Sequence, residues 1–202
     1  MTRLIPFAVA VFVFQQIPAF LDSAGTWLDL VTPFVVLGAA AWTLRGAARA
    51  ALVFAAAAAI LYADGHGIHL SANAVGHYNG IAGRAEEVRH FWDERFGHIE
   101  WHLGFLGVLA ALALADERRG SPDRTGWVAA MLLGWTLFVN TVEGQDWWLT
   151  LGAAVFFAGW MLARPARTLA ACALATFIGA ALIGIWAAWH GGVPQFSDLG
   201  WL

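Results

Sequence analysis

The chain has 202 residues, of which 60% are hydrophobic and 12% charged. An ordinary soluble domain is about half apolar and about a quarter charged, so the composition predicts an integral membrane protein. The net charge of −3 at pH 7 gives no reason to expect a nucleic-acid partner. All eleven basic residues are arginine. The absence of lysine excludes a retinal Schiff base, which needs a lysine amine.

The apolar segments predict an all-α polytopic protein with seven transmembrane helices in a single domain, residues 1–202. A span needs about 20 residues, and we expect the spans near residues 1–20, 27–44, 50–77, 90–115, 126–141, 147–163 and 168–190. Gly65 and Gly67 flank His66, and we expect them to interrupt the third span. Residues 79–89 contain two glycines and mixed charge, which predicts a connecting loop before the fourth span.

The arginines gather in alternate connections between these spans. One set of connections and ends holds Arg3, Arg45, Arg49, Arg118, Arg119, Arg124, Arg164 and Arg167, whereas the other set is acidic or nearly balanced. Positively charged short loops stay on the cytoplasmic side. The pattern therefore predicts a protein of the plasma or inner membrane with its N-terminus cytoplasmic and its C-terminus external.

Six of the seven histidines lie between residues 64 and 102. Residues three and four apart share one face of a helix, which predicts one polar stripe of His66, His69, Asn73 and His77 and a second of His90, Glu94, His98 and His102. Both stripes belong to the external ends of their spans in the predicted topology. Polar residues within membrane spans are costly and usually functional, so we expect the stripes to form a site.

Histidine and carboxylate side chains together predict a transition-metal site. Zinc, iron, copper and nickel accept imidazole nitrogen, whereas calcium and magnesium require mainly oxygen ligands. The predicted ligands are His66, His69, His98 and His102. The predicted carboxylate ligand or general acid and base is Glu94 or Glu143. Further candidates, as ligands or as residues that orient ligands, are Asp64, Asn73, His77, His90 and Asn140.

The favoured hypothesis is a zinc-type hydrolase facing the external or periplasmic side. Zinc lowers the pKa of a bound water to about 7, so that hydroxide attacks an ester or amide. A membrane lipid or other amphiphile is the expected substrate, because it can enter from the outer leaflet. Seven spans with a histidine-bound metal resemble the architecture of the alkaline ceramidase and adiponectin-receptor superfamily. The paired histidines of that family belong to the last span, which here holds only His190, so no residue role is transferred.

Two alternatives remain open at the level of the sequence. One is a dinuclear iron or copper oxidoreductase similar to a hydroxylase or desaturase, because six histidines with several carboxylates exceed the needs of one zinc ion. HGIH and HIEWH do not reproduce the HxxHH boxes of the membrane desaturases. The other is a metal or haem carrier without catalysis, although the sequence has no CxxCH haem-attachment motif. Within the class of membrane lipids and amphiphiles, the particular substrate is not predicted, nor are the number of metal ions and the oligomeric state.

Overall fold

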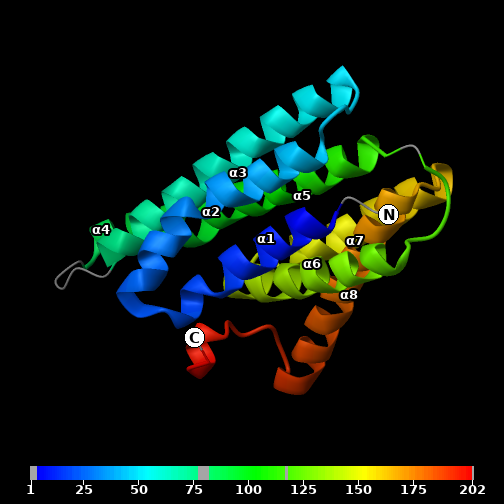
Figure 1. Ribbon diagram of the computed structural model, residues 1–202. Helices are drawn as coiled ribbons and strands as arrows, with labels where there is room; N and C mark the ends of the chain where they lie inside the picture. The colour runs from blue at the N-terminus through cyan, green and yellow to red at the C-terminus, as the bar shows by residue number, and fades with distance from the viewer. Residues whose placement is uncertain (1–3, 77–81, 117, 202) are drawn as a thin grey trace.

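The computed structural model describes residues 4–76, 82–116 and 118–201. These residues fold into helices joined by short connections (Figure 1). The helices in chain order are α1 (Ile5–Gln16), η1 (Pro18–Phe20), α2 (Asp22–Thr43), α3 (Arg49–Gly76), α4 (Arg84–His90), η2 (Phe91–Gly97), α5 (His98–Leu114), α6 (Arg124–Glu143), α7 (Trp148–Ala163), α8 (Arg167–His190) and η3 (Ser197–Leu199). The prediction of an all-helical protein is confirmed for this part of the chain.

Two groups of helices make up the bundle. In one group α3 and α5 lie side by side, and α2 packs against α3 (Figure 1). In the other, α8 packs against both α6 and α7. Helix α1 joins the groups, because it contacts α2 and α6. The interior is apolar, with Phe105, Leu109 and Leu133 almost fully buried.

Small residues bring α3 and α5 into backbone contact. A Cβ atom added at Gly65 would lie 2.3 Å from the Trp101 backbone nitrogen, and one at Gly104 would lie 2.2 Å from the Tyr62 backbone nitrogen. Membrane helices approach this closely only where their interface lacks side chains. The glycines therefore fix the distance between the two histidine-bearing helices.

The third and fourth predicted spans differ from the structure in detail. Helix α3 continues through Gly65 and Gly67 without a break; the predicted interruption is wrong, because Gly65 serves close packing and the helix tolerates both residues. The predicted loop over 79–89 is wrong in its second half, where α4 begins at Arg84. Helices α4, η2 and α5 follow one another directly, so an apolar helical run extends over Arg84–Leu114.

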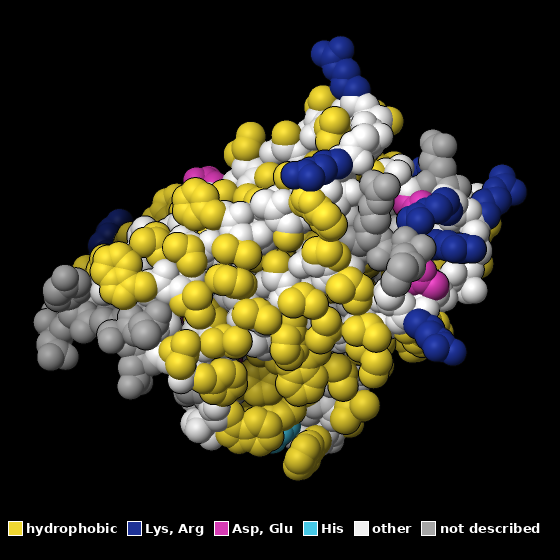
Figure 2. Space-filling model, in the orientation of Figure 1, with side chains coloured by type: hydrophobic (Ala, Val, Ile, Leu, Met, Phe, Trp, Pro, Cys, Tyr) yellow, Lys and Arg dark blue, Asp and Glu magenta, His cyan; other side chains and the backbone are white. Residues whose placement is uncertain are grey.

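Four helical segments are long and apolar enough to cross a membrane: Arg49–Gly76, Arg84–Leu114, Arg124–Glu143 and Arg167–His190. The remaining apolar helices, Ile5–Phe20, Trp27–Thr43 and Trp148–Ala163, are shorter. Hydrophobic side chains cover the middle of the face shown in Figure 2. These features are consistent with insertion into a membrane.

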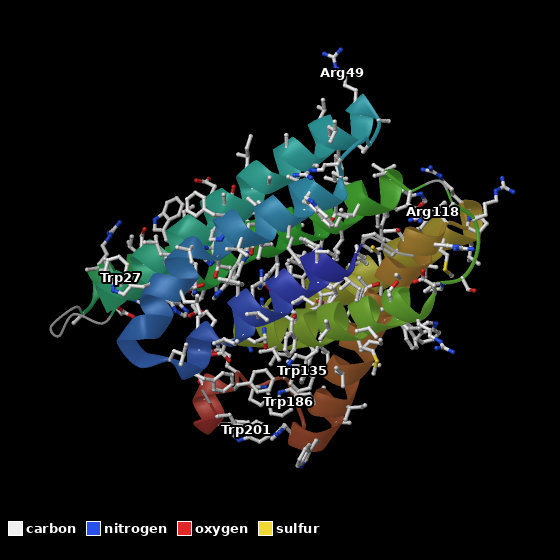
Figure 3. All side chains as sticks on the ribbon, viewed as in Figure 1. Trp27, Arg49, Arg118, Trp135, Trp186 and Trp201 are labelled. Carbon is white, nitrogen blue, oxygen red and sulfur yellow. The ribbon has the colours of Figure 1, made fainter. Side chains whose placement is uncertain are left out.

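The arginines are concentrated at one end of the bundle. The α2–α3, α5–α6 and α7–α8 connections lie toward this end (Figure 1). This arginine-rich end carries Arg45, Arg49, Arg118, Arg119, Arg124, Arg164 and Arg167. Trp27 lies toward the opposite end, far from Arg118 in Figure 3. Because α3 runs away from the arginine-rich end, its histidines lie toward the opposite end.

Candidate metal centre

Three side chains from three helical elements converge in one small group. His69 comes from α3, Asp93 from η2 and His98 from the start of α5. One potential ligand atom of each lies within 4.8 Å of the others. Asp93 and His98 are buried, and the His69 side chain is 17% exposed. This His69–Asp93–His98 group can hold a metal ion.

The π-helical segment η2 explains why Asp93 belongs to the group. A π-helical turn closes over five residues, and the backbone N–H of His98 donates to the carbonyl oxygen of Asp93. Residues five apart, such as Asp93 and His98, therefore lie on nearly the same face. In a regular α-helix they would diverge. Single π-helical turns occur frequently at functional sites.

Two neighbours hold the Asp93 carboxylate in place. Its Oδ1 lies 2.7 Å from Nδ1 of His69, and its Oδ2 accepts a 2.8 Å hydrogen bond from Nη1 of Arg89. Arg89 also donates through Nε and Nη2 to Glu86, one turn earlier on α4. The guanidinium group is thus fixed on both sides, and it orients the carboxylate toward His69.

His66 and His102, on either side of the His69–Asp93–His98 group, each pair with a carboxylate of their own. Nε2 of His66 lies 3.0 Å from Oδ1 of Asp29 on α2. Nδ1 of His102 lies 2.6 Å from Oδ2 of Asp146, in the connection between α6 and α7. A carboxylate on one ring nitrogen selects the tautomer and leaves the other nitrogen available, an arrangement common at metal sites.

The four histidines form a row around Trp101. Ring centroids are 6.5 Å apart between His66 and His69, 4.4 Å between His69 and His98, and 5.8 Å between His98 and His102. The indole of Trp101 contacts all four rings, at centroid distances of 4.7 to 6.0 Å. The predicted ligand set is thus brought together in space, although only its two central members share the three-residue group.

Several buried polar atoms along this row have no hydrogen-bond partner among the described residues. They are Nδ1 of His66, Oε2 of Glu94, Nδ1 of His98, Nε2 of His102 and Oδ1 of Asp146. A buried polar atom without a partner costs about 1–3 kcal/mol. So many buried polar atoms without hydrogen-bond partners in one place are unusual in a folded protein. A bound cation with its water ligands would satisfy part of this set.

The spacing of the group is compatible with a metal of zinc size. Two ligand atoms on a tetrahedral ion lie about 3.3 Å apart when each bond is about 2.0–2.1 Å. Nδ1 of His69 and Oδ1 of Asp93 are 2.7 Å apart and share a hydrogen bond. Binding would replace that proton and separate the two atoms by about 0.6 Å. The partly exposed His69 leaves room for such a shift.

Glu94 lies beside the group and presents a carboxylate without a fixed partner. Its Oε2 is 3.4 Å from Nδ1 of His98, and its side chain is 26% exposed. The contact is too long for a strong hydrogen bond. Glu94 is therefore placed to contact a ligand or water held at the group.

Glu143 and Asn140 lie in other hydrogen-bond networks. Oε2 of Glu143 accepts from the backbone N–H groups of Phe196 and Ser197, so this carboxylate anchors the C-terminal segment. The Asn140 amide bonds Gln15 and Gln16 on α1. Neither side chain belongs to the His69–Asp93–His98 group.

The other sequence candidates lie farther from the group or cannot be placed. Asn73 and Asp64 on α3 are exposed, and Asp64 lies beside Glu100 of α5. His90 is exposed at the end of α4. His77 lies outside the described residues.

Four of the residues that build the site were not singled out from the sequence. Asp93, Arg89, Asp29 and Asp146 complete the contacts of the histidines. One signal was available for the acids: a carboxylate in an apolar chain needs a partner, and histidine is a natural one. The pairing of His102 with a residue 44 positions away had no local signature.

Comparisons with protein-family models, with curated proteins and with solved structures gave no match. We therefore infer the function from the geometry of the site.

Proposed function

We propose that the chain is an integral-membrane metalloenzyme that binds one transition-metal ion, zinc, at His69, Asp93 and His98. The observation that carries this proposal is the convergence of these three side chains within 4.8 Å. Two histidines and one carboxylate leave a fourth position for water, which is the pattern of catalytic zinc sites rather than structural ones.

Hydrolysis is the chemistry that suits such a centre. Zinc lowers the pKa of its bound water to about 7 and polarises a carbonyl oxygen. With an ion held by His69, Asp93 and His98, that water would supply hydroxide to the carbonyl carbon of an ester or amide, and the bond to the alcohol or amine would break. The proton released by the water passes to the leaving group. A carboxylate beside the metal can carry that proton.

Glu94 is the proposed general base and acid. It is the carboxylate nearest to His98 without a strong partner. His102 and His66 flank the centre with their outer nitrogens held by Asp146 and Asp29. We propose that they orient the row and bind solvent or substrate. Glu143 is not included, because its carboxylate accepts two backbone N–H groups of the C-terminal segment.

The proposed substrate is a membrane lipid or another amphiphile with an ester or amide bond. A groove of about 690 Å³ runs between α3 and α4, with Ile68, Val75, Val88 and Trp92 among its walls. Arg89 lines this groove and also bonds Asp93. An apolar chain in the groove would place its polar end beside the metal ligands, and the volume lies within the 300–1,000 Å³ of typical ligand sites.

The proposed location is the external side of a plasma or inner membrane. The arginine-rich end would face the cytoplasm, so that seven membrane-embedded helices place the N-terminus inside and the C-terminus outside. The His69–Asp93–His98 group belongs to the opposite end of α3 and α5. A lipid of the outer leaflet could then reach it laterally.

Turnover by the purified, zinc-loaded chain tests the proposal. A long-chain p-nitrophenyl ester and a fluorogenic N-acyl amide serve as probes. We expect zinc-dependent release of product, and a decrease of about 10²- to 10⁴-fold in Glu94→Gln with metal content unchanged. Glu143→Gln is the matched control and should keep the activity. Equal activity of wild type and Glu94→Gln would contradict the role of Glu94.

An iron oxidoreductase is the second candidate, favoured by the donor set itself. Two histidines and one carboxylate also bind non-haem Fe(II) in oxygenases. The sequence left a dinuclear centre open as an alternative, but among the described residues only His69, Asp93 and His98 form a group with the spacing of a metal site, which favours one ion. Iron in the purified protein, together with oxygen consumption on adding an amphiphile, would support this candidate over the hydrolase. Metal binding without either reaction would support a carrier.

A further inference from the structure

The C-terminal segment, residues 193–201, turns back from α8 and packs against the end of α6. Its anchor is Phe196, which is 6% exposed. The centroid of the Phe196 ring lies 5.4 Å from that of Phe138 on α6 and 4.7 Å from that of Trp186 on α8. Trp201 also packs on Trp186, at 5.2 Å (Figure 3). The proposed hydrolysis does not involve these side chains.

Hydrogen bonds join this segment to the end of α6, where the connection to α7, residues 144–147, begins. Oε2 of Glu143, the last residue of α6, accepts from the backbone N–H groups of Phe196 and Ser197 at 2.8 and 3.3 Å. The carbonyl oxygen of Glu143 accepts from the side-chain amide of Gln195. The start of the connection is therefore fixed to the C-terminal segment through both the backbone and the side chain of one residue.

Gln145 fixes the connection to the same segment at a second point. Its φ is +52°, in the left-handed region that residues other than glycine adopt at an energetic cost. Its side-chain amide donates to the carbonyl oxygens of Val142 and Val193, at 2.9 and 3.0 Å. These two bonds hold the turn between α6 and the C-terminal segment. The residue that follows, Asp146, is buried in the bundle.

The same connection lies directly against two histidines of the row. A Cβ atom added at Gly144 would be 3.0 Å from Cγ of His98 and 3.2 Å from Cε1 of His102. Asp146, only 1% exposed, places Oδ2 at 2.6 Å from Nδ1 of His102. A displacement of the connection would therefore move the carboxylate away from His102 and free both imidazole rings to rotate.

We propose that the C-terminal segment positions His98 and His102, acting through Gln145 and Asp146. Its importance for metal binding rests on the proposed function, in which His98 is a ligand. Two observations favour positioning over a role in fold stability alone. The hydrogen bonds of the segment gather at one short connection, and that connection contacts both rings. Residues that orient the histidines of a metal site typically raise metal affinity by about 10- to 100-fold.

Two substitutions release the connection from the segment. Gln145→Gly removes the amide contact with Val193, while glycine adopts the positive φ at this position without strain. We expect the affinity for zinc, measured by competition with a chelator, to fall about tenfold. The visible absorption of the cobalt-loaded chain should also change, because it reports the geometry of the ligands. Phe196→Ala, which removes the apolar anchor of the segment, should have the same two effects.

Leu199→Ala and Glu143→Gln are the control variants. Leu199 is an exposed residue of the same segment. Glu143→Gln keeps an oxygen that can accept from the backbone N–H groups of Phe196 and Ser197. Both variants should bind zinc within about twofold of wild type. A tenfold loss in both would contradict the assignment of the effect to Gln145 and Phe196.

The metal-free chain provides a measurement that does not depend on the proposed function. The 2.6 Å contact between His102 and Asp146 predicts a far-downfield ring N–H signal in proton NMR, assigned by its loss in Asp146→Asn. If the signal shifts in Gln145→Gly and Phe196→Ala but the wild type binds no metal, the positioning is upheld and the proposed metal centre is rejected. If both variants unfold at lower temperature but keep the signal, the zinc affinity and the cobalt spectrum, the segment only stabilises the fold and the proposal is overturned.

Discussion

Two carboxylates near opposite ends of the Arg84–Leu114 helical run have contrasting surroundings. Both oxygens of Asp116 accept two hydrogen bonds each, from Arg118 and Thr168. Asp93 is also fully engaged, but Glu94 Oε2 and His98 Nδ1 beside it meet only across a long contact of 3.4 Å. Nδ1 of His66 and Nε2 of His102 have no hydrogen-bond partner among the described residues. A cluster whose buried polar atoms all have hydrogen-bond partners is complete without a ligand. A cluster with buried polar atoms that lack a partner indicates a ligand, because each such atom lowers the stability of the fold by about 1–3 kcal/mol.

The largest effect is expected from a substitution in the interface between α3 and α5, which positions the His69–Asp93–His98 group. Gly65→Ala would place a Cβ 2.3 Å from the Trp101 backbone, which only a shift of α3 away from α5 can relieve. We expect a loss of about 3 kcal/mol or more in stability and loss of metal binding. Thermal unfolding in detergent measures the first and elemental analysis the second.

Gly67→Ala is the matched control for this substitution. It lies two residues further along the same helix, with nothing within 4 Å of the added Cβ. Alanine is favoured over glycine by about 1 kcal/mol in a helix, so this variant should be as stable as wild type or slightly more stable. If both variants behave alike, close packing of α3 on α5 does not position the site.

An intermediate effect on metal affinity is expected when Arg89, which holds the Asp93 carboxylate, is replaced. Arg89→Gln removes the Nη1 donor that holds Oδ2 of Asp93, and it leaves the three proposed ligands in place. Loss of a residue that orients a metal ligand typically lowers metal affinity by about 10- to 100-fold. Competition with a chelator of known affinity measures the change. Arg95→Gln, an exposed arginine of η2, should leave the affinity unaltered; a comparable loss there would point to a general effect of charge.

The smallest effect is expected at Asp116, whose contribution to the stability of the fold also depends on pH. Burial acts to raise the pKa of Asp116, but hydrogen bonds from Arg118 and Thr168 outweigh it and lower the pKa to about 2. The stabilisation is therefore fully present above about pH 4 and is lost as the pH falls toward 2. Asp116→Asn should cost about 1–2 kcal/mol at pH 7, and the difference from wild type should vanish near pH 2. A difference that persists at pH 2 would contradict this assignment.

The sequence predicted the helical architecture and the closeness of His69 to His98, because helical spacing and apolar composition are local properties. It did not predict that Asp93 joins them. That contact depends on the π-helical register of η2, and residue periodicity does not reveal where a backbone hydrogen bond shifts from four to five residues. The glycines of α3 were misinterpreted for a related reason. Whether a glycine interrupts a helix or allows close packing is decided by the opposing helix.

Elemental analysis of the purified, detergent-solubilised chain tests most directly whether the His69–Asp93–His98 group holds a metal ion. We predict about one transition-metal ion per chain, mainly zinc. His98→Ala should lose most of it, whereas His90→Ala, which changes an exposed histidine outside the group, should retain it. A wild-type chain that binds no metal after incubation with zinc or iron, or a His98→Ala variant with full metal content, would contradict the account.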